Sequence, residues 1–228
     1  MRPIFLLFVL ALFPLYGQDM SKVHFVRASG EATVTAKPDR AQISIGVVTH
    51  AATAQAAAAQ NAEETTQVIH SLKSALGANG DVKTTAYSIS PQYDYGNQGH
   101  PPKLAGYEAS NTVLATEDDL SSLGKVIDAA TSSGANNING ISFTLRDENP
   151  VKQKALVEAT DRARANAETI ARALNLHVTG VLQAEPTEMP VFRPMPMAMQ
   201  AKIAAVATPI EAGNLDVSAR VTVVLQVE

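Results

Sequence analysis

The chain alternates between segments with a two-residue hydrophobic period and segments with a helical period. Residues 41–48 show the first kind, with an apolar side made of Ala41, Ile43, Ile45 and Val47. The last predicted strand, residues 217–227, alternates in the same way. A period of two is typical of a strand with one buried face and one face in water. Both segments are therefore predicted to border a hydrophobic core.

An opening hairpin is predicted from the residues that precede the first of these strands. Residues 23–36 are rich in β-forming residues, and the Ser29-Gly30 pair in their middle suits a bulge or a bend. The Lys37-Pro38-Asp39 sequence that follows is a turn signal. We therefore expect residues 23–36 to pair with residues 41–48 across this turn.

Two helices are predicted before residue 135. Residues 52–76 begin alanine-rich and continue with apolar residues at helical spacing, and Gly77 ends this helix. A short second helix ends at Gly134. Its start is predicted at Thr116, an N-cap with Asp119 at the third helical position, which resembles a capping box.

A third, long helix has the clearest start in the chain. Asn149 supplies a capping side chain and Pro150 follows at the first helical position. The helix is predicted to run to about Leu174, with alanine at every fourth position: Ala155, Ala159, Ala163 and Ala167. Small residues at that spacing allow a helix to lie close to a neighbouring surface.

The predicted fold class is α+β, with mainly antiparallel sheets, two long helices and one short helix. The remaining strands are expected at residues 82–93, 104–116, 137–147 and 177–185. The order is then β-β-α-β-β-α-β-α-β-β. Residues 41–116 and 138–227 share the order strand, long helix, strand, loop, strand, which suggests an internal pseudo-repeat within one intertwined domain.

The first residues are typical of a secretory signal peptide. Arg2 precedes an apolar run from Ile4 to Tyr16, which is shorter than the roughly 20 residues of a membrane-spanning helix. Cleavage is predicted after Gly17, which leaves residues 18–228 as a single exported domain with no transmembrane segment. An uncleaved N-terminal anchor is the alternative.

Residues 186–211 stand apart, because they are rich in proline and methionine. Repeated proline excludes a regular helix or strand across the first half of this segment. Met195, Met197 and Met199 are candidate thioether ligands for Cu(I). The alternative is that these flexible apolar side chains cover a neighbouring subunit or an exposed sheet edge. No His or Cys lies within ten residues of the three methionines to strengthen a copper site.

Composition excludes several classes of function. The chain has no cysteine, which rules out disulfides, thiolate catalysis and Cys-ligated metals. A formal net charge of -4, from 18 Lys+Arg against 22 Asp+Glu, disfavours a nucleic-acid partner. The five histidines are scattered, and motifs for zinc hydrolysis, a serine nucleophile or phosphate binding are missing from the sequence. We therefore predict no catalytic residue and no cofactor.

Three further groups of residues are predicted to have structural roles and no catalytic role. The carboxylates Glu117, Asp118 and Asp119 are attributed to the positive end of the second helix. Charged residues around 158–168 are attributed to a solvated helix face with ion pairs. The tyrosines Tyr93, Tyr95 and Tyr107 are expected to pack over a sheet edge, with a binding patch as the alternative.

The order of several short motifs resembles the SIMPL-domain family, the family of YggE and the periplasmic immunogenic proteins. The matching segments are Gly30-Glu31-Ala32, Pro38-Asp39-Arg40-Ala41, Gly106-Tyr107-Glu108-Ala109, Asp119-Leu120 with Leu123-Gly124 and Ile127-Asp128, Gly134-Ala135 with Ile138, the alanines of the third helix, and Glu211–Gly213. The resemblance covers essentially all of residues 23–228.

The resemblance implies an α+β domain in the periplasm or at the cell surface, homo-oligomeric assembly, and a loose link to oxidative-stress defence. It transfers no catalytic residue. The predicted function is that of an exported, non-enzymatic protein that acts through self-assembly or through binding an envelope protein; association with the outer membrane is left open. The alternatives are a periplasmic Cu(I)-binding protein and a hydrolase with an unfamiliar site.

Overall fold

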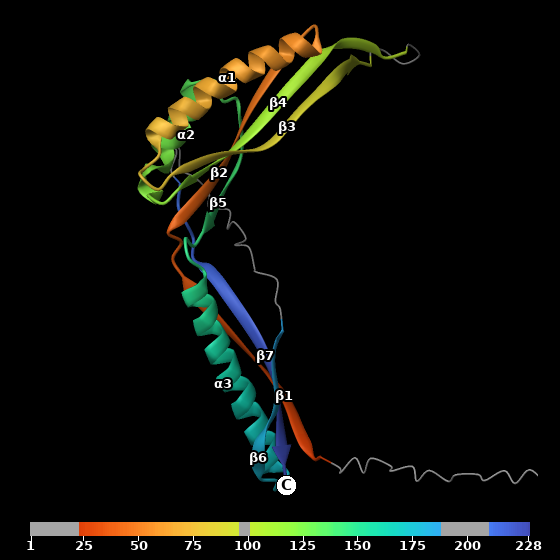
Figure 1. Cartoon of the computed structure of the whole chain (residues 1–228), viewed down its shortest axis with the longest axis vertical. Helices are drawn as coiled ribbons and strands as arrows, with labels where there is room; N and C mark the ends of the chain where they lie inside the picture. The colour runs from red at the N-terminus through yellow and green to blue at the C-terminus, as the bar shows by residue number, and fades with distance from the viewer. Residues whose placement is uncertain (1–22, 96–100, 188–209) are drawn as a thin grey trace, which may run out of the picture.

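The structure, a computed structural model, describes residues 23–95, 101–187 and 210–228 (Figure 1). It confirms the α+β class with two antiparallel sheets, two long helices and one short helix, and it confirms the order of these elements. The predicted signal peptide and the three candidate copper ligands, Met195, Met197 and Met199, lie outside the described residues.

One unit of the fold is a four-stranded sheet in the order β3-β4-β2-β5, covered by α1 and α2. Its elements are β2 (Arg40–Ala51), α1 (Ala54–Ala75), β3 (Asp81–Asp94), β4 (Lys103–Glu117), the 3₁₀ helix η1 (Leu120–Ser122), α2 (Leu123–Ser132) and β5 (Asn137–Thr144). The apolar side predicted for residues 41–48 lies in the core, where Ile43 and Ile45 are completely buried. Each such side chain stabilises the fold by about 1.5–3 kcal/mol.

The other unit is a three-stranded sheet in the order β1-β7-β6, with α3 across one face. Its elements are β1 (Phe25–Ala36), α3 (Asn149–Ala173), β6 (Val178–Thr187) and β7 (Leu215–Val227). The alanine ladder of α3 is fully buried against β1 and β7, as predicted. Gly30 lies directly beneath this ladder, so the helix backbone approaches the strand closely.

The predicted opening hairpin is wrong. β1 pairs along its whole length with β7, whereas β2 pairs with β4 and β5. The buried face of β1 packs on α3 and that of β2 packs with α1 and α2, so the two strands serve different cores. The alternation of residues within a strand identifies its buried face but carries no information about its partner. The predicted bulge at Ser29-Gly30 is also wrong, because the β1–β7 register runs through these residues without a shift.

Two predicted helix starts also need correction. Thr116 lies within β4, and Asp119 instead caps η1, where its carboxylate accepts the Ser121 N–H at 3.0 Å. The long helix starts at Asn149 itself, one residue after the cap position at Glu148, and Asp147 Oδ1 accepts the Asn149 N–H at 2.9 Å.

The pseudo-repeat with the predicted bounds is not confirmed. β5 (Asn137–Thr144) was expected to open the second repeat, yet it pairs with β2 at the edge of the four-stranded sheet. In the three-stranded sheet its place is taken by β1, which comes from the start of the chain. The four-stranded unit is therefore inserted between β1 and α3 in sequence. None of the helices described is long and apolar enough to span a membrane.

Candidate functional site

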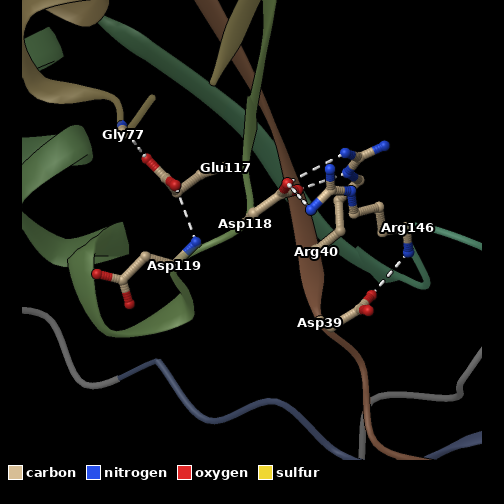
Figure 2. A network of polar contacts seen from close by, with 7 residues as sticks. All are labelled: Asp39, Arg40, Gly77, Glu117, Asp118, Asp119 and Arg146. Carbon is tan, nitrogen blue, oxygen red and sulfur yellow. Dashed lines mark hydrogen bonds and ion pairs between the residues drawn. The ribbon is translucent and has the colours of Figure 1, made fainter. Parts of the chain in front are cut away.

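The two units meet where the chain passes between β1 and β2 and again between β5 and α3. These two connections are bonded to each other: Asp39 donates its N–H to Thr144 O at 3.3 Å, and Asp39 Oδ1 accepts the Arg146 N–H at 2.6 Å. Figure 2 shows the polar network that surrounds them. The turn signal at Lys37-Pro38-Asp39 therefore marks the crossing between two sheets.

An arginine–aspartate pair lies at the centre of this network. Arg40 Nε donates to Asp118 Oδ1 at 2.7 Å and Nη2 donates to Oδ2 at 3.3 Å, a two-pronged contact (Figure 2). Arg146 Nη1 lies 3.8 Å from the same carboxylate. The hydrogen bond from Arg40, with the positive charges of both arginines, lowers the pKa of Asp118 below its ordinary value of 3.8, although desolvation opposes the shift. The same contact raises the pKa of Arg40.

The lowered pKa of Asp118 predicts a pH dependence of stability. A carboxyl whose pKa is depressed by folding adds stability above its unfolded pKa of 3.8 and loses it as the pH falls through the folded value. We expect Asp118→Asn to lower the free energy of unfolding at neutral pH and to match the wild type in strong acid. Urea unfolding across this pH range measures the difference. Asp128→Asn, at an exposed position of α2, is the control; a gap for Asp118→Asn that stays constant with pH would contradict the assignment.

The Glu117 side chain points away from Arg40 and is buried in the four-stranded unit. Its side chain is 2% exposed. Oε2 accepts the Gly77 N–H and Oε1 accepts the Asp119 N–H, both at 2.8 Å (Figure 2). The carboxylate thus ties the end of α1 to the start of η1. The helix-start interpretation of the 117–119 cluster holds for Asp119, whose carboxylate caps η1, but not for Glu117 and Asp118, which bond elsewhere.

A second polar anchor, which was not predicted from the sequence, lies beneath α1. Asn61 is completely buried, and its Nδ2 donates to Val47 O at 2.8 Å and to Ala109 O at 3.1 Å. These carbonyls belong to neighbouring strands, so one amide fixes the helix on β2 and β4. The nearby Asn111 Oδ1 is buried without a hydrogen-bond partner among the described residues. The only sequence signal was a polar residue on the apolar side of the helix.

The free sheet edges carry several exposed large apolar side chains. β6 is exposed along almost its whole length and carries Val178, Val181 and Leu182, of which Val181 is 62% exposed. β3, at the edge of the other sheet, exposes Tyr87, Ile89 and Tyr93.

Two of the three tyrosines singled out from the sequence lie near each other on paired strands. Tyr93 lies in β3, and Tyr107 lies in β4 opposite Pro91, two residues before Tyr93. Tyr95 is 73% exposed just beyond β3.

The charged face of α3 is solvated as predicted, with an Arg164–Glu168 ion pair at 2.7 Å. Arg162 has a further contact, since its Nη1 donates to Glu31 O on the outer edge of β1 at 2.8 Å. Asn166 does the same to Ser29 O at 3.0 Å. Two side chains of α3 therefore occupy carbonyls on the free edge of β1. Among residues 23–95, 101–187 and 210–228, no group of three or more His, Asp or Glu side chains is placed to hold a metal ion.

The fold and its junction define an α+β protein in which a helix-covered four-stranded sheet is inserted into a helix-covered three-stranded one. The sequence model of the SIMPL family, described as a protein of unknown function (DUF541), matches residues 26–225. The chain therefore belongs to the SIMPL family, as its motifs indicated.

Two relatives illustrate the similarity. The chain is 29% identical over 231 residues to the 26 kDa periplasmic immunogenic protein of Brucella melitensis, and this alignment covers 97% of this chain and 92% of the relative. It is 31% identical over 184 residues to the uncharacterized protein YggE of Escherichia coli, and this alignment covers 81% of this chain and 73% of YggE.

Proposed function

We propose that the chain is an exported protein of the cell envelope that acts through contacts with copies of itself. Export is supported by the apolar run that follows Arg2, which is typical of a cleaved signal peptide ending at residue 17. The name of the Brucella relative, which places that protein in the periplasm, supports the same location. Residues 18–228 are then one SIMPL domain.

The observation that carries the assembly proposal is the state of β6. It pairs with β7 on one side only, and α3 covers β1 and β7 but barely reaches β6. An edge strand offers unpaired N–H and C=O groups, which accept another strand, and natural proteins usually protect such an edge with charge or proline. β6 has Glu185 and Pro186 only near its C-terminal end, and its first half exposes Val178, Val181 and Leu182. A second copy laid along this edge would pair its backbone and bury these side chains.

A charge placed on this edge tests assembly. We expect residues 18–228 to form a closed oligomer in light scattering, and Val181→Lys to weaken association at least about tenfold, because a buried Lys without a partner is costly. Val181 is 62% exposed in the single chain, so its fold should be retained. Val157→Lys on the outer face of α3, where Val157 is 60% exposed, is the matched control. A wild type that stays a single chain at every concentration, or equal effects of the two lysines, would contradict the proposal.

The proposal includes a non-enzymatic role, which is supported by the junction, where Asp39, Arg40 and Asp118 bond to neighbouring groups of the protein. The sequence leaves two alternatives from other classes, a hydrolase with an unfamiliar site and Cu(I) binding by Met195, Met197 and Met199. Titration of the purified protein with Cu(I) separates the copper carrier from the assembly protein: tight stoichiometric binding that is lost when the three methionines are replaced favours the carrier. A role in oxidative-stress defence would use the same methionines as oxidisable groups, and peroxide treatment followed by mass spectrometry should then find sulfoxide there first.

A further inference from the structure

On the face of the three-stranded sheet that is turned away from α3, mostly polar side chains are aligned in rows across the strands. The register places Arg27, Val224 and Gln183 side by side across β1, β7 and β6. The next row on the same face contains Thr222 and Glu185. Because side chains two residues apart point to the same side of a strand, these rows stand next to each other on one surface.

A cavity of about 250 Å³ lies over these two rows. Its floor includes Val224, which is buried although it belongs to the face without a helix. Arg27 lies in its wall on one side and Glu185 on the other, with Gln183 and Thr222 also among its lining residues. The volume is below the range of about 300–1,000 Å³ that drug-sized ligands occupy, so the cavity fits a metabolite of a few heavy atoms.

The two charged groups of the cavity, Arg27 and Glu185, lie on opposite sides of β7 and form no ion pair with each other. Arg27 makes no hydrogen bond or ion pair with any residue the structure describes, and Glu185 accepts only the Gln183 amide, at 2.5 Å. With strands about 4.8 Å apart and rows about 6.6 Å apart, the Cα atoms of Arg27 and Glu185 are separated by about 12 Å across β7. On the same face, by contrast, Arg220 and Glu31 are paired at 2.7 Å.

We propose that this cavity binds a small α-amino acid, whose carboxylate meets Arg27 and whose ammonium group meets Glu185. A simple anion would be repelled by Glu185 and a simple cation by Arg27, whereas a ligand with both charges satisfies both groups. The apolar floor at Val224 favours a short aliphatic side chain. The site uses side chains on the open face of the sheet, including Glu185 of β6, whereas assembly would use the backbone groups along the free edge of β6, so the two proposals are tested separately.

Ligand-observed saturation-transfer NMR with L- and D-alanine tests this site in residues 18–228. The method works for a single chain and for a large oligomer. We expect saturable binding of at least one enantiomer, and binding at least about tenfold weaker for propanoate, which lacks the ammonium group, and for ethylamine, which lacks the carboxylate. Arg27→Met and Glu185→Gln should each weaken alanine binding at least about tenfold. Arg220→Met, on the same face but outside the cavity, should change it by less than about twofold.

Three results would overturn the proposal: no alanine binding, propanoate or ethylamine that binds as tightly as alanine, or Arg27→Met with unchanged affinity. Both substituted positions are exposed, so the fold should tolerate them. If Arg27→Met fails to fold, Glu185→Gln and the two analogues decide the question. A protein that binds alanine but stays a single chain would support this site and contradict the assembly proposal, so the two failures are distinguishable.

Discussion

Replacing Gly30 by valine is expected to cause the largest loss of stability of any substitution considered. A Cβ atom at this position would lie 2.2 Å from Ala163 N and 2.3 Å from Ala159 O, both backbone atoms of α3. Backbone cannot rotate away as a side chain can, so the whole helix would have to move off β1. Overpacking of a tight core costs about 1–3 kcal/mol and occasionally more, and we expect a loss of at least about 3 kcal/mol here.

Urea unfolding followed by circular dichroism measures this loss. Gly180→Val is the matched control, because a Cβ at Gly180 in β6 would meet no atom within 4 Å. Its effect should stay within about 0.5 kcal/mol, as for most surface positions. If both glycines tolerate valine equally, the close approach of α3 to β1 is not what the structure shows, and the alanine ladder would need another explanation.

Replacing Glu117 by alanine is expected to have the second largest effect. The substitution would leave the N–H groups of Gly77 and Asp119 without their acceptor at a place where the carboxylate is 2% exposed. A buried donor left unpaired costs about 1–3 kcal/mol. With two donors affected, we expect a loss of about 3 kcal/mol in the free energy of unfolding.

Two control variants separate the buried contacts from charge alone. Glu117→Gln keeps one acceptor oxygen and should recover part of the loss. Glu108→Ala removes a carboxylate from the same strand that is 32% exposed, accepts the Gln92 amide and lies 3.9 Å from His50 Nδ1, so it should cost about 1 kcal/mol or less. Equal stability of Glu117→Ala and Glu108→Ala would show that the buried contacts of Glu117 add nothing.

The elements and their buried faces could be predicted from the sequence. Ile43 and Ile45 lie in the core because a period of two marks the inner face of a strand, and Ala159 and Ala163 do so because small residues recur at helical spacing. These are local properties of the chain. The order of short motifs predicted membership of the SIMPL family, and the match of the family model to residues 26–225 confirmed it.

The pairing of strands and the polar network could not be predicted in the same way. β1 pairs with β7, about 190 residues later in the chain, and no local pattern encodes a partner at that distance. For the same reason Glu117 and Asp118 looked like one acidic cluster. In the structure these neighbours point to opposite sides, one to the end of α1 and the other to Arg40 (Figure 2). Gly30 looked like a bend and is in fact a site of close helix packing.

Hydrogen–deuterium exchange of residues 18–228 at two protein concentrations tests the central claim, that the chain works through the free edge of β6. We predict that backbone amides of β6, Val178–Thr187, exchange more slowly in the concentrated sample, while those of α3 exchange at the same rate in both. Exchange of the β6 amides that is equally fast at both concentrations, with a single-chain mass throughout, would contradict the account.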